Sequence, residues 1–531
     1  MLHQELRHGG NSTSIHLRAG LISGYVLCGH GVWFSWSVVV VMLLQVGYPY
    51  SLNGLFSLIA IAGMAGGSLR IALGFLLPQF TSPWVLGLSM ALLVLPALGM
   101  AVALQYHATL ETLQVLALLS GLGGGCYSLY LQRLDTSLHH HQRHRVLGLG
   151  IGIGQLGMAA SLILLPWVVT LGFWQSPGHI LVDGKESSTL LGSVAGDRVW
   201  ISNIGWAWSL LLTGLLLVLA ALSGWERWGG GHGGLAPEQS RRTHNTVAQG
   251  MASTSWAIGV GLLVSMLGCW LTLPPEANGM GLQVSRELVM AAMLIIMLAL
   301  LRLFPQVRQD NAHSPYSIFN NKHTWVMSVM CSMSLGSFLG LAAALPLTLE
   351  WTFGYVLAAD GMRQPNPNAP GVFTYVWMGP FIGILMRPVG GWVADRFGGA
   401  RTTQCCALVM MLAAAGAAFY LGAAYRAPEP EQYFFPFCLL MFVLFSAAGA
   451  GHASVLFSVE RLFPASQQRH LNTWMAGIAA YGMFYIPGLL AEQLQRGTPE
   501  QAMVSFALFY ALCLLLNGWF YLRREGTFYN P

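Results

Sequence analysis

The chain has 531 residues, of which 55% are hydrophobic and only 8% are charged, and it contains 63 glycines. Soluble proteins carry about 25% charged residues, so this composition excludes a soluble protein and indicates one that crosses a membrane many times. The net charge of +5 does not indicate a nucleic-acid partner. All eight cysteines lie in apolar runs without a CxxC pair, so we expect neither a disulfide nor a zinc site.

Apolar runs of the roughly 20 residues needed to cross a bilayer recur along the chain. The first set of six lies at 21–46, 52–77, 82–105, 111–132, 146–171 and 201–222. A polar, glycine-rich segment at 223–252 separates this set from two further runs at 254–273 and 285–304. The second set of six lies at 324–349, 372–394, 402–425, 433–458, 471–491 and 501–521.

These runs predict an all-α membrane protein with fourteen spans. The predicted domains are an N-terminal six-helix bundle (1–222), a cytoplasmic linker (223–252), an inserted helix pair (253–305) and a C-terminal six-helix bundle (306–531). Neither helix of the inserted pair carries a charge in mid-span, so we expect the pair to be peripheral.

The distribution of basic residues predicts the orientation. With both termini in the cytoplasm, seventeen of the 25 Lys and Arg residues fall in cytoplasmic segments and six fall outside. Cytoplasmic loops are enriched in Lys and Arg, so we expect a multi-pass protein of the cell inner membrane with both termini inside. The two remaining basic residues are Arg70 and Arg387, each within a predicted span.

Arg70 and Arg387 have matching surroundings in the two sets of six spans. Each arginine has a glycine four residues before it and another four residues after it, in Gly66–Gly74 and Gly383–Gly391. Arg387 precedes the polar exit at Asp395 by about two turns, which places it roughly 12 Å inside the membrane edge. A charge at that depth is costly and normally faces a cavity, where it has a function.

The two arginines are suited to an anion. A guanidinium group binds a planar oxyanion through two parallel hydrogen bonds, which a lysine cannot do. No carboxylate lies in the middle of a predicted span, so Arg70 and Arg387 are expected to bind one anion from opposite halves. The alternative is that each arginine forms a structural ion pair with a buried acid.

A second repeat supports the division into two halves. Gly121-x-Gly123 is followed by Arg133, and Gly449-x-Gly451 is followed by Arg461 at the same spacing. Parallel six-helix repeats with a binding site between them at mid-membrane are typical of transporters.

Three segments resemble the nitrate/nitrite porters, the NarK-like family of the major facilitator superfamily. Residues 377–401 are similar to that family's eighth helix and the following loop, and residues 321–340 are similar to its seventh helix. Gly148–Gly157 keeps the glycine spacing of the family's nitrate signature on the fifth helix. The resemblance covers both six-helix halves but not 254–304 or 172–200. It implies the major facilitator fold and alternating-access exchange of nitrate and nitrite.

The resemblance also implies further site residues. The implied substrate-binding residues, besides the two arginines, are Gly152, Gly154, Gln155, Cys331 and Leu335. The implied gating residues, in the loop motif at 391–399, are Gly391, Asp395 and Arg396.

The sequence departs from the family at several polar positions. The two asparagines of the nitrate signature are Gly150 and Gln155, and the family's tyrosine and phenylalanine on the seventh helix are Cys331 and Leu335. Cys126 stands where an asparagine is usual. These departures put selectivity for nitrate in question, since fewer side chains remain to hydrogen-bond the anion.

Few groups in the predicted spans could carry protons. Proton-driven transporters commonly use Asp, Glu or His within their helices, and only His30 and His452 qualify in this chain. Hydrogen-bonded packing is the favoured interpretation of both histidines, so we expect anion exchange rather than proton symport. A proton-linked transporter of another small organic or inorganic compound, and a non-transporting anion sensor, are the alternatives.

Other activities have less support in the sequence. We find no nucleophile–base pair and expect no enzyme, cofactor or metal; the histidines at 139–144 are interpreted as part of a cytoplasmic loop, with a metal site as the alternative. The expected partners are a small anion (nitrate or nitrite) and the lipid bilayer, with no nucleic acid, and the chain is expected to act as a monomer.

Overall fold

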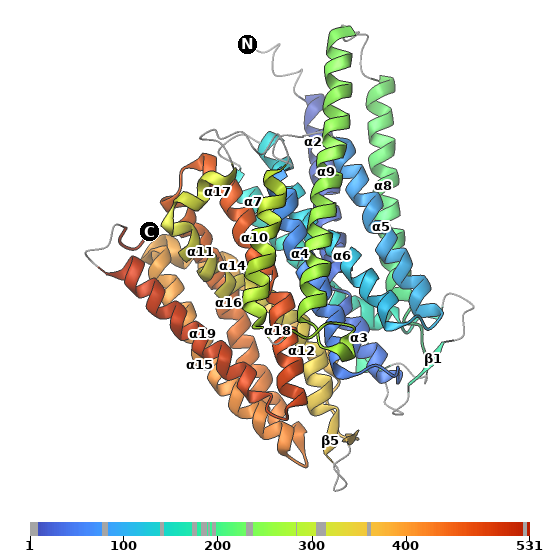
Figure 1. Ribbon diagram of the computed structural model, residues 1–531, viewed down its shortest axis with the longest axis vertical. Helices are drawn as coiled ribbons and strands as arrows, with labels where there is room; N and C mark the ends of the chain where they lie inside the picture. The colour runs from blue at the N-terminus through green and yellow to red at the C-terminus, as the bar shows by residue number, and fades with distance from the viewer. Residues whose placement is uncertain are drawn as a thin grey trace.

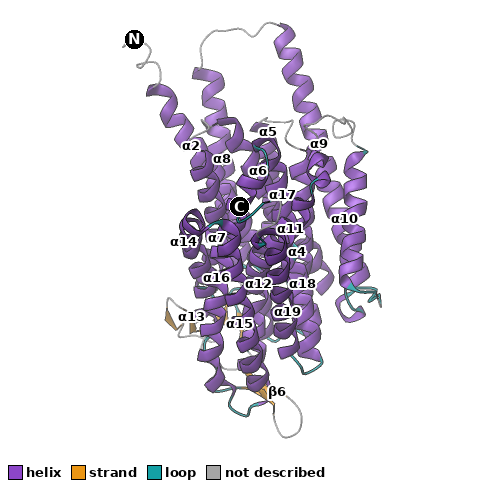
Figure 2. Ribbon diagram, turned by 90° about the vertical axis from the view of Figure 1, so that its left-hand side faces the viewer, coloured by secondary structure: helices purple, strands orange, loops and turns teal. Residues whose placement is uncertain are grey.

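The structure is a computed structural model that consists almost entirely of helices. It describes residues 9–76, 83–137, 143–172, 178–181, 188–189, 192–193, 198–229, 237–282, 284–303, 315–357, 363–523 and 528–531. In these residues eleven helical segments are long and apolar enough to cross a membrane. The helices run along the length of the molecule, and short strands lie together at one end (Figures 1 and 2). The expected all-α membrane architecture is therefore confirmed.

In the described part of the N-terminal half there are seven helices. They are α2 (Gly9–Phe34), α3 (Trp36–Gln45), α4 (Leu52–Leu76), α5 (Pro83–Gln105), α6 (Leu110–Ser137), α7 (Arg143–Val168) and α8 (Asn203–Gly229). α2 and α3 together form the first predicted span and meet at Ser35, whose hydroxyl donates a hydrogen bond to the Gly31 carbonyl (2.8 Å). Two antiparallel strand pairs precede α8, namely β1 (His179–Ile180) with β4 (Arg198–Val199) and β2 (Ser188–Thr189) with β3 (Gly192–Ser193).

The inserted pair consists of α9 (Pro237–Thr272) and α10 (Arg286–Arg302), joined through the short helix η2 (Pro275–Ala277). α9 lies against α4, where the Ser265 hydroxyl donates to the Met64 carbonyl (3.4 Å). α8 and α9 also extend into the polar segment 223–252, so much of this predicted linker is helical. Hydropathy marks where a helix leaves the membrane, but a helix satisfies its own backbone and can continue into water. Figure 1 shows these ends of α8 and α9 projecting from the bundle.

The C-terminal half contains the second set of spans. Its helices are η3 (Pro315–Asn320), α11 (Lys322–Cys331), η4 (Ser332–Gly336), α12 (Ser337–Phe353), α13 (Val372–Tyr375), α14 (Met378–Phe397), α15 (Gly399–Arg426), η5 (Pro430–Tyr433), α16 (Phe434–Leu462), α17 (Ala465–Ala480), α18 (Gly482–Gln495), α19 (Glu500–Asn517) and η6 (Gly518–Leu522). The antiparallel strands β5 (Tyr355–Leu357) and β6 (Arg363–Pro365) follow α12. The turn η4 is a π-helix between α11 and α12, and such turns are frequent at functional sites.

The glycines of the sequence repeat bring helix backbones together in both halves. In the N-terminal half, a Cβ on Gly124 of α6 would lie 2.6 Å from the Cα of Gly66 of α4. In the C-terminal half, a Cβ on Gly449 of α16 would overlap the carbonyl oxygen of Gly383 of α14. Small residues permit this close approach of membrane helices, which associate without a strong hydrophobic force between them. The two halves therefore repeat the same helix contact.

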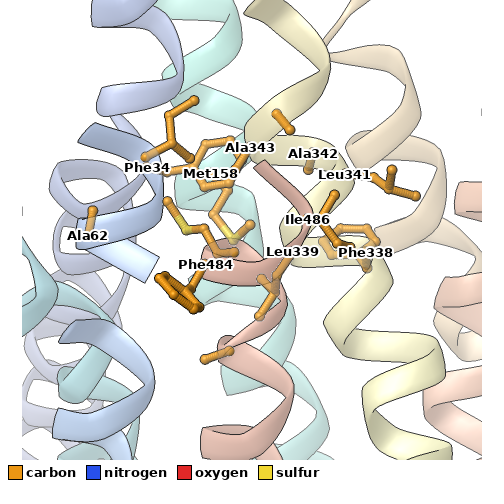
Figure 3. Close-up of a cluster of buried hydrophobic side chains, with 14 of the residues drawn as sticks. Phe34, Ala62, Met158, Phe338, Leu339, Leu341, Ala342, Ala343, Phe484 and Ile486 are labelled. Atoms are coloured by element: carbon orange, nitrogen blue, oxygen red, sulfur yellow. The ribbon is translucent and has the colours of Figure 1, made fainter. Parts of the chain in front are cut away.

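An apolar cluster joins the two halves at the level of Phe34, Met158, Phe338 and Phe484. These side chains come from α2, α7, α12 and α18, and each is at most 2% exposed. Figure 3 shows them packed together with neighbouring residues of α4, α12 and α18. Beside this cluster, the Ser37 hydroxyl of α3 donates a hydrogen bond to the Ala343 carbonyl of α12 (2.9 Å). The two halves are therefore in close contact at this apolar cluster.

Candidate functional site

Arg70, in the C-terminal third of α4, is held by three hydrogen-bonding partners. Its side chain is 3% exposed. Nε donates to the Gly124 carbonyl of α6 (3.0 Å), and Nη1 donates to the Ala476 carbonyl of α17 in the other half (3.2 Å). Nη2 lies 3.2 Å from Nε2 of His30 on α2. The guanidinium group is therefore satisfied by neutral acceptors.

Arg387, on α14, has unused donors. Nε and Nη2 are shielded from solvent and have no hydrogen-bonding partner in the described part of the chain. These two atoms form one edge of the guanidinium group, the geometry that holds a planar oxyanion through two parallel hydrogen bonds. A buried donor left unpaired costs about 1–3 kcal/mol, and more if it is charged. This edge is the strongest structural indication of an anion-binding site.

The two arginines share neighbours. Tyr127 of α6 and Cys331 of α11 each lie within electrostatic range of both guanidinium groups, and the Tyr127 ring centroid is 5.0 Å from the Arg70 guanidinium carbon. His452 of α16 interacts with both as well. Arg70 and Arg387 therefore act on one region between the halves. Among the described residues, no carboxylate forms an ion pair with either arginine.

An aromatic ring lies beside each arginine. The Trp33 ring centroid is 5.3 Å from the Arg70 guanidinium carbon, and the Phe338 centroid is 5.9 Å from that of Arg387. Each ring also packs on the glycine that precedes its arginine by four residues, since a Cβ on Gly66 would lie 2.5 Å from Trp33 and one on Gly383 would lie 2.7 Å from Phe338. Trp33 and Phe338 are therefore equivalent positions in the two halves.

Among the described residues, this equivalence accounts for the unpaired Nη2 of Arg387, since the matching Nη2 of Arg70 is paired by a histidine. Three residues before Trp33, on the same face of the helix, is His30, which hydrogen-bonds Arg70. Three residues before Phe338 is Leu335, which lies in η4 and cannot accept a hydrogen bond. The second half thus lacks the side-chain acceptor that the first half supplies.

The implied site residues of α7 differ in their surroundings. Gly154 faces α2, because a Cβ there would lie 3.0 Å from the His30 ring. Gly152 has open space on the side where its Cβ would be. Gln155 is 3% exposed, and its Oε1 has no hydrogen-bonding partner among the described residues. Gln155 therefore keeps a free acceptor, whereas Gly152 and Gly154 offer only backbone and space.

Cys331 and Leu335, from the seventh predicted span of the main set, are both buried, at 1% and 5% exposure. The Cys331 thiol lies near both arginines, but Leu335 offers the site only apolar surface. Cys331 is the last residue of α11, and Leu335 lies in the π-turn η4.

The implied gating residues lie at the end of α14. Asp395 and Arg396 are exposed, and Arg396 stacks on Trp392 at 4.2 Å from the ring centroid. Asp395 makes no hydrogen bond or ion pair within the part of the chain that the structure describes. No atom lies within 4 Å of a Cβ built on Gly391, whereas one on Gly390 would overlap Ala450 of α16. The helix contact is therefore made by Gly390, not by Gly391, which is the glycine four residues after Arg387 in the sequence repeat.

The two histidines of the predicted spans differ. Nδ1 of His30 lies 2.9 Å from the Val26 carbonyl and its Nε2 contacts Arg70, as hydrogen-bonded packing requires. His452 is 3% exposed, yet its Nδ1 has no partner among the described residues. The hydrogen-bonded packing interpretation therefore has no support at Nδ1 of His452 and stays a prediction. Tyr127, which the sequence analysis missed, directly follows the glycine run and Cys126 on α6.

The histidines at 139–144 lie partly outside the described residues, and the structure does not test a metal site there. Among the residues that it does describe, no group of three potential ligands could hold a metal ion.

A bundle of long apolar helices, with Arg70 and the shielded Nε and Nη2 of Arg387 in its interior, defines a multi-pass membrane protein with the fold of the major facilitator transporters. A solved POT family transporter in complex with a thioalcohol-conjugated peptide matches with a TM-score of 0.55 at 13% identity, covering 93% of this chain and 94% of that one. The xylose transporter XylE from E. coli, in a partially occluded inward-open conformation, matches with a TM-score of 0.53 at 13% identity, covering 95% and 98%. These likenesses establish the fold.

Relatives with sequence similarity over most of the chain have transporter names. The chain is 28% identical over 498 residues to the probable nitrate/nitrite antiporter NarK2 of Thermus thermophilus. It is 23% identical over 517 residues to the nitrate/nitrite transporter NarU of Salmonella typhimurium. Each match covers 93% of this chain and 89% of the relative. No family model matches the chain.

Proposed function

We propose that the protein exchanges nitrate and nitrite across the membrane by alternating access of its two six-helix halves. The names of its relatives, at 23% to 28% identity over 93% of the chain, support this substrate class. The single observation that carries the proposal is the buried, unpaired Nε–Nη2 edge of Arg387. Nitrate and nitrite are planar monoanions, and each can accept two hydrogen bonds from that edge.

Arg70 completes the proposed site from the other half. Its positive charge acts on the same region, which Tyr127 and Cys331 share with Arg387. Gln155 from α7 is proposed to contact the anion through its amide N–H, since its unpaired Oε1 is an acceptor and cannot hydrogen-bond an anion. We assign Arg387 as the principal anion ligand and Arg70 as the second cation, with Gly152, Gly154, Cys331 and Leu335 lining the site. Gly391, Asp395 and Arg396 are proposed to act in gating.

Fourteen spans are proposed for the whole chain. Eleven segments of the described chain are long and apolar enough to cross the membrane. We add the helices α6, α7 and α10 to these eleven, which gives fourteen spans. An even number of spans puts both termini on one side of the membrane. The excess of basic residues in the loops on that side favours a location of both termini in the cytoplasm of a cell with an inner membrane.

The proposed site lies within one chain, so a monomer suffices for transport.

Exchange is favoured because the site carries two positive charges. Moving one net charge against a potential of 100 mV costs about 2.3 kcal/mol, whereas one-for-one exchange of monovalent anions avoids that cost. The empty carrier would also have to move with the Arg387 edge unpaired. An anion bound on each crossing removes this penalty.

Counterflow in proteoliposomes tests the proposal. Vesicles loaded with nitrate, nitrite, formate or chloride, or with no permeant anion, are given labelled nitrate outside. We expect rapid uptake with nitrate or nitrite inside and little uptake into anion-free vesicles, with or without an imposed pH gradient. Equal uptake into anion-free vesicles would contradict exchange, and no uptake under any condition would contradict nitrate transport.

A further inference from the structure

His30 and His452 lie near the same two arginines but have opposite hydrogen-bonding states. An arginine can only donate hydrogen bonds, so Nε2 of His30 accepts from Arg70 Nη2 and its Nδ1 donates to the Val26 carbonyl. This pair of contacts uses both nitrogens and fixes His30 as a neutral imidazole. His452, 3% exposed, has an Nδ1 without a partner among the described residues.

We propose that His452 is a further anion-binding residue and that its imidazole takes up a proton when the anion binds. The inference rests on the proposed function, since it concerns the same site. His452 lies on α16, within electrostatic range of both Arg387 and Arg70. It can therefore donate an N–H to an anion that the Arg387 edge already holds, and replace hydrogen bonds that Cys331 and Leu335 do not supply.

The groups that face His452 make its charge depend on the anion. Arg387 from α14 and Arg70 from α4 are positive, and the other titratable side chains at these arginines include the phenol of Tyr127 from α6, the thiol of Cys331 from α11 and the neutral imidazole of His30 from α2. No carboxylate pairs with either arginine among the described residues. In the empty site a third positive charge is therefore disfavoured by burial and by two like charges.

A bound monoanion reverses this balance. It cancels one positive charge and offers an acceptor oxygen to a protonated imidazole, and a charge-assisted hydrogen bond of this kind is about twice as strong as a neutral one. Binding is reciprocal, so if the anion favours protonation of His452, a lower pH favours the anion. The effect is limited to about tenfold in affinity per pH unit, since one proton is involved.

This linkage is compatible with exchange. If nitrate and nitrite each bind with a proton, one-for-one exchange carries one proton in each direction and moves no net proton. Protonation at the site therefore does not require net proton transport.

Isothermal titration calorimetry of the purified full-length protein with nitrate, in buffers of different ionisation enthalpy, measures the protons taken up for each anion bound. Between pH 5 and 8 we expect the wild-type protein to take up a fraction of a proton for each nitrate bound. Its affinity for nitrate should fall by up to about tenfold for each unit by which the pH rises. His452→Asn keeps a side-chain donor but cannot titrate, so its proton uptake should vanish and its affinity should no longer follow pH. His452→Gln serves the same purpose if the asparagine variant does not fold.

His30→Asn is the matched comparison. Its shorter side chain moves the acceptor away from Arg70 Nη2 and should weaken nitrate binding, while the number of protons per nitrate stays that of the wild type. His470→Asn, a change at a buried histidine of α17 outside the site, should alter neither quantity. Wild-type binding without proton uptake, or undiminished uptake in both His452 variants, would overturn the inference. If the wild-type protein bound neither nitrate nor nitrite at any pH, the proposed function would fail and this inference with it.

Discussion

Nη1 of Arg70 donates a hydrogen bond to the carbonyl oxygen of Ala476, 3.2 Å away, and this bond joins the N-terminal half to the C-terminal half. Arg387, the matching arginine of the second half, has no hydrogen-bonding partner for Nε and Nη2 among the described residues. The two arginines therefore differ in what they do for the empty protein. Arg70 contributes to the contact between the halves, and Arg387 presents an unused pair of donors.

Arg387→Lys should reduce nitrate transport strongly without destabilising the protein. Lysine keeps the charge but cannot form two parallel hydrogen bonds with one planar anion, and the loss of a charge-assisted bond of about 1.5–3 kcal/mol corresponds to a roughly ten- to hundredfold decrease. Counterflow of labelled nitrate measures the loss, and thermal unfolding in detergent measures stability. Arg426→Lys, at the ion pair with Glu500 within the C-terminal half, is the control and should transport normally. Wild-type counterflow by Arg387→Lys would contradict the assignment.

Arg70→Lys should lower both transport and stability. The substitution removes donors to the Gly124 and Ala476 carbonyls, and each bond from a charged donor contributes about 1.5–3 kcal/mol. The midpoint of thermal unfolding should therefore fall further for Arg70→Lys than for Arg387→Lys. Equal midpoints in the two variants would show that the three contacts of Arg70 do not stabilise the folded protein.

Gly449→Ala should disrupt the contact between α14 and α16. The added methyl group would overlap the carbonyl oxygen of Gly383, and overpacking of this kind costs about 1–3 kcal/mol or more. Gly391→Ala is the matched control, since no atom lies within 4 Å of the new methyl group and alanine favours the helix. Thermal unfolding should separate the two variants. A normal unfolding midpoint for Gly449→Ala would mean that α14 and α16 can shift apart at little cost.

Glu276→Ala should loosen the end of the molecule where α4 begins and α18 ends. Glu276, in the loop of the inserted helix pair, accepts hydrogen bonds from Asn53 of the N-terminal half (3.0 Å) and Gln495 of the C-terminal half (3.2 Å). The pair was expected to be peripheral, yet this carboxylate connects both halves. Hydrogen exchange should become faster in the first turn of α4 and the last turn of α18.

Glu500→Ala is the control for that measurement, because the Glu500 ion pair with Arg426 stays within the C-terminal half. It should leave exchange in the first turn of α4 unchanged. If Glu276→Ala also left α4 unchanged, the two hydrogen bonds of Glu276 would not hold the halves together at this end.

Selectivity among small anions should be loose. Cys331 and Leu335 offer the anion little hydrogen bonding, and a site with few polar contacts discriminates weakly between analogues. Formate and chlorate, added outside in excess, should compete measurably with labelled nitrate in counterflow. Strict preference for nitrate and nitrite would show that Gln155 and His452 supply the missing contacts.

The sequence by itself determined the helical architecture and the two arginines. Apolar runs of about 20 residues must be helices in a bilayer, because no water is present to satisfy their backbone groups. Arg70 and Arg387 are the only basic residues in the interior of a predicted span, since Arg286 and Arg302 lie at the two ends of 285–304, and their matching glycines mark the two halves without any knowledge of the fold. Local pattern alone therefore placed the spans and singled out the charges.

Tertiary structure decided what each arginine contacts. The partners of Arg70 lie 54, 406 and 40 residues away in the chain, so no local spacing predicts them. The same holds for the unused atoms of Arg387 and His452, because a polar group is satisfied or not according to the atoms that other helices bring to it. Hydropathy also failed to show that α8 and α9 continue into the predicted linker, since a helix that satisfies its own backbone can leave the membrane without ending.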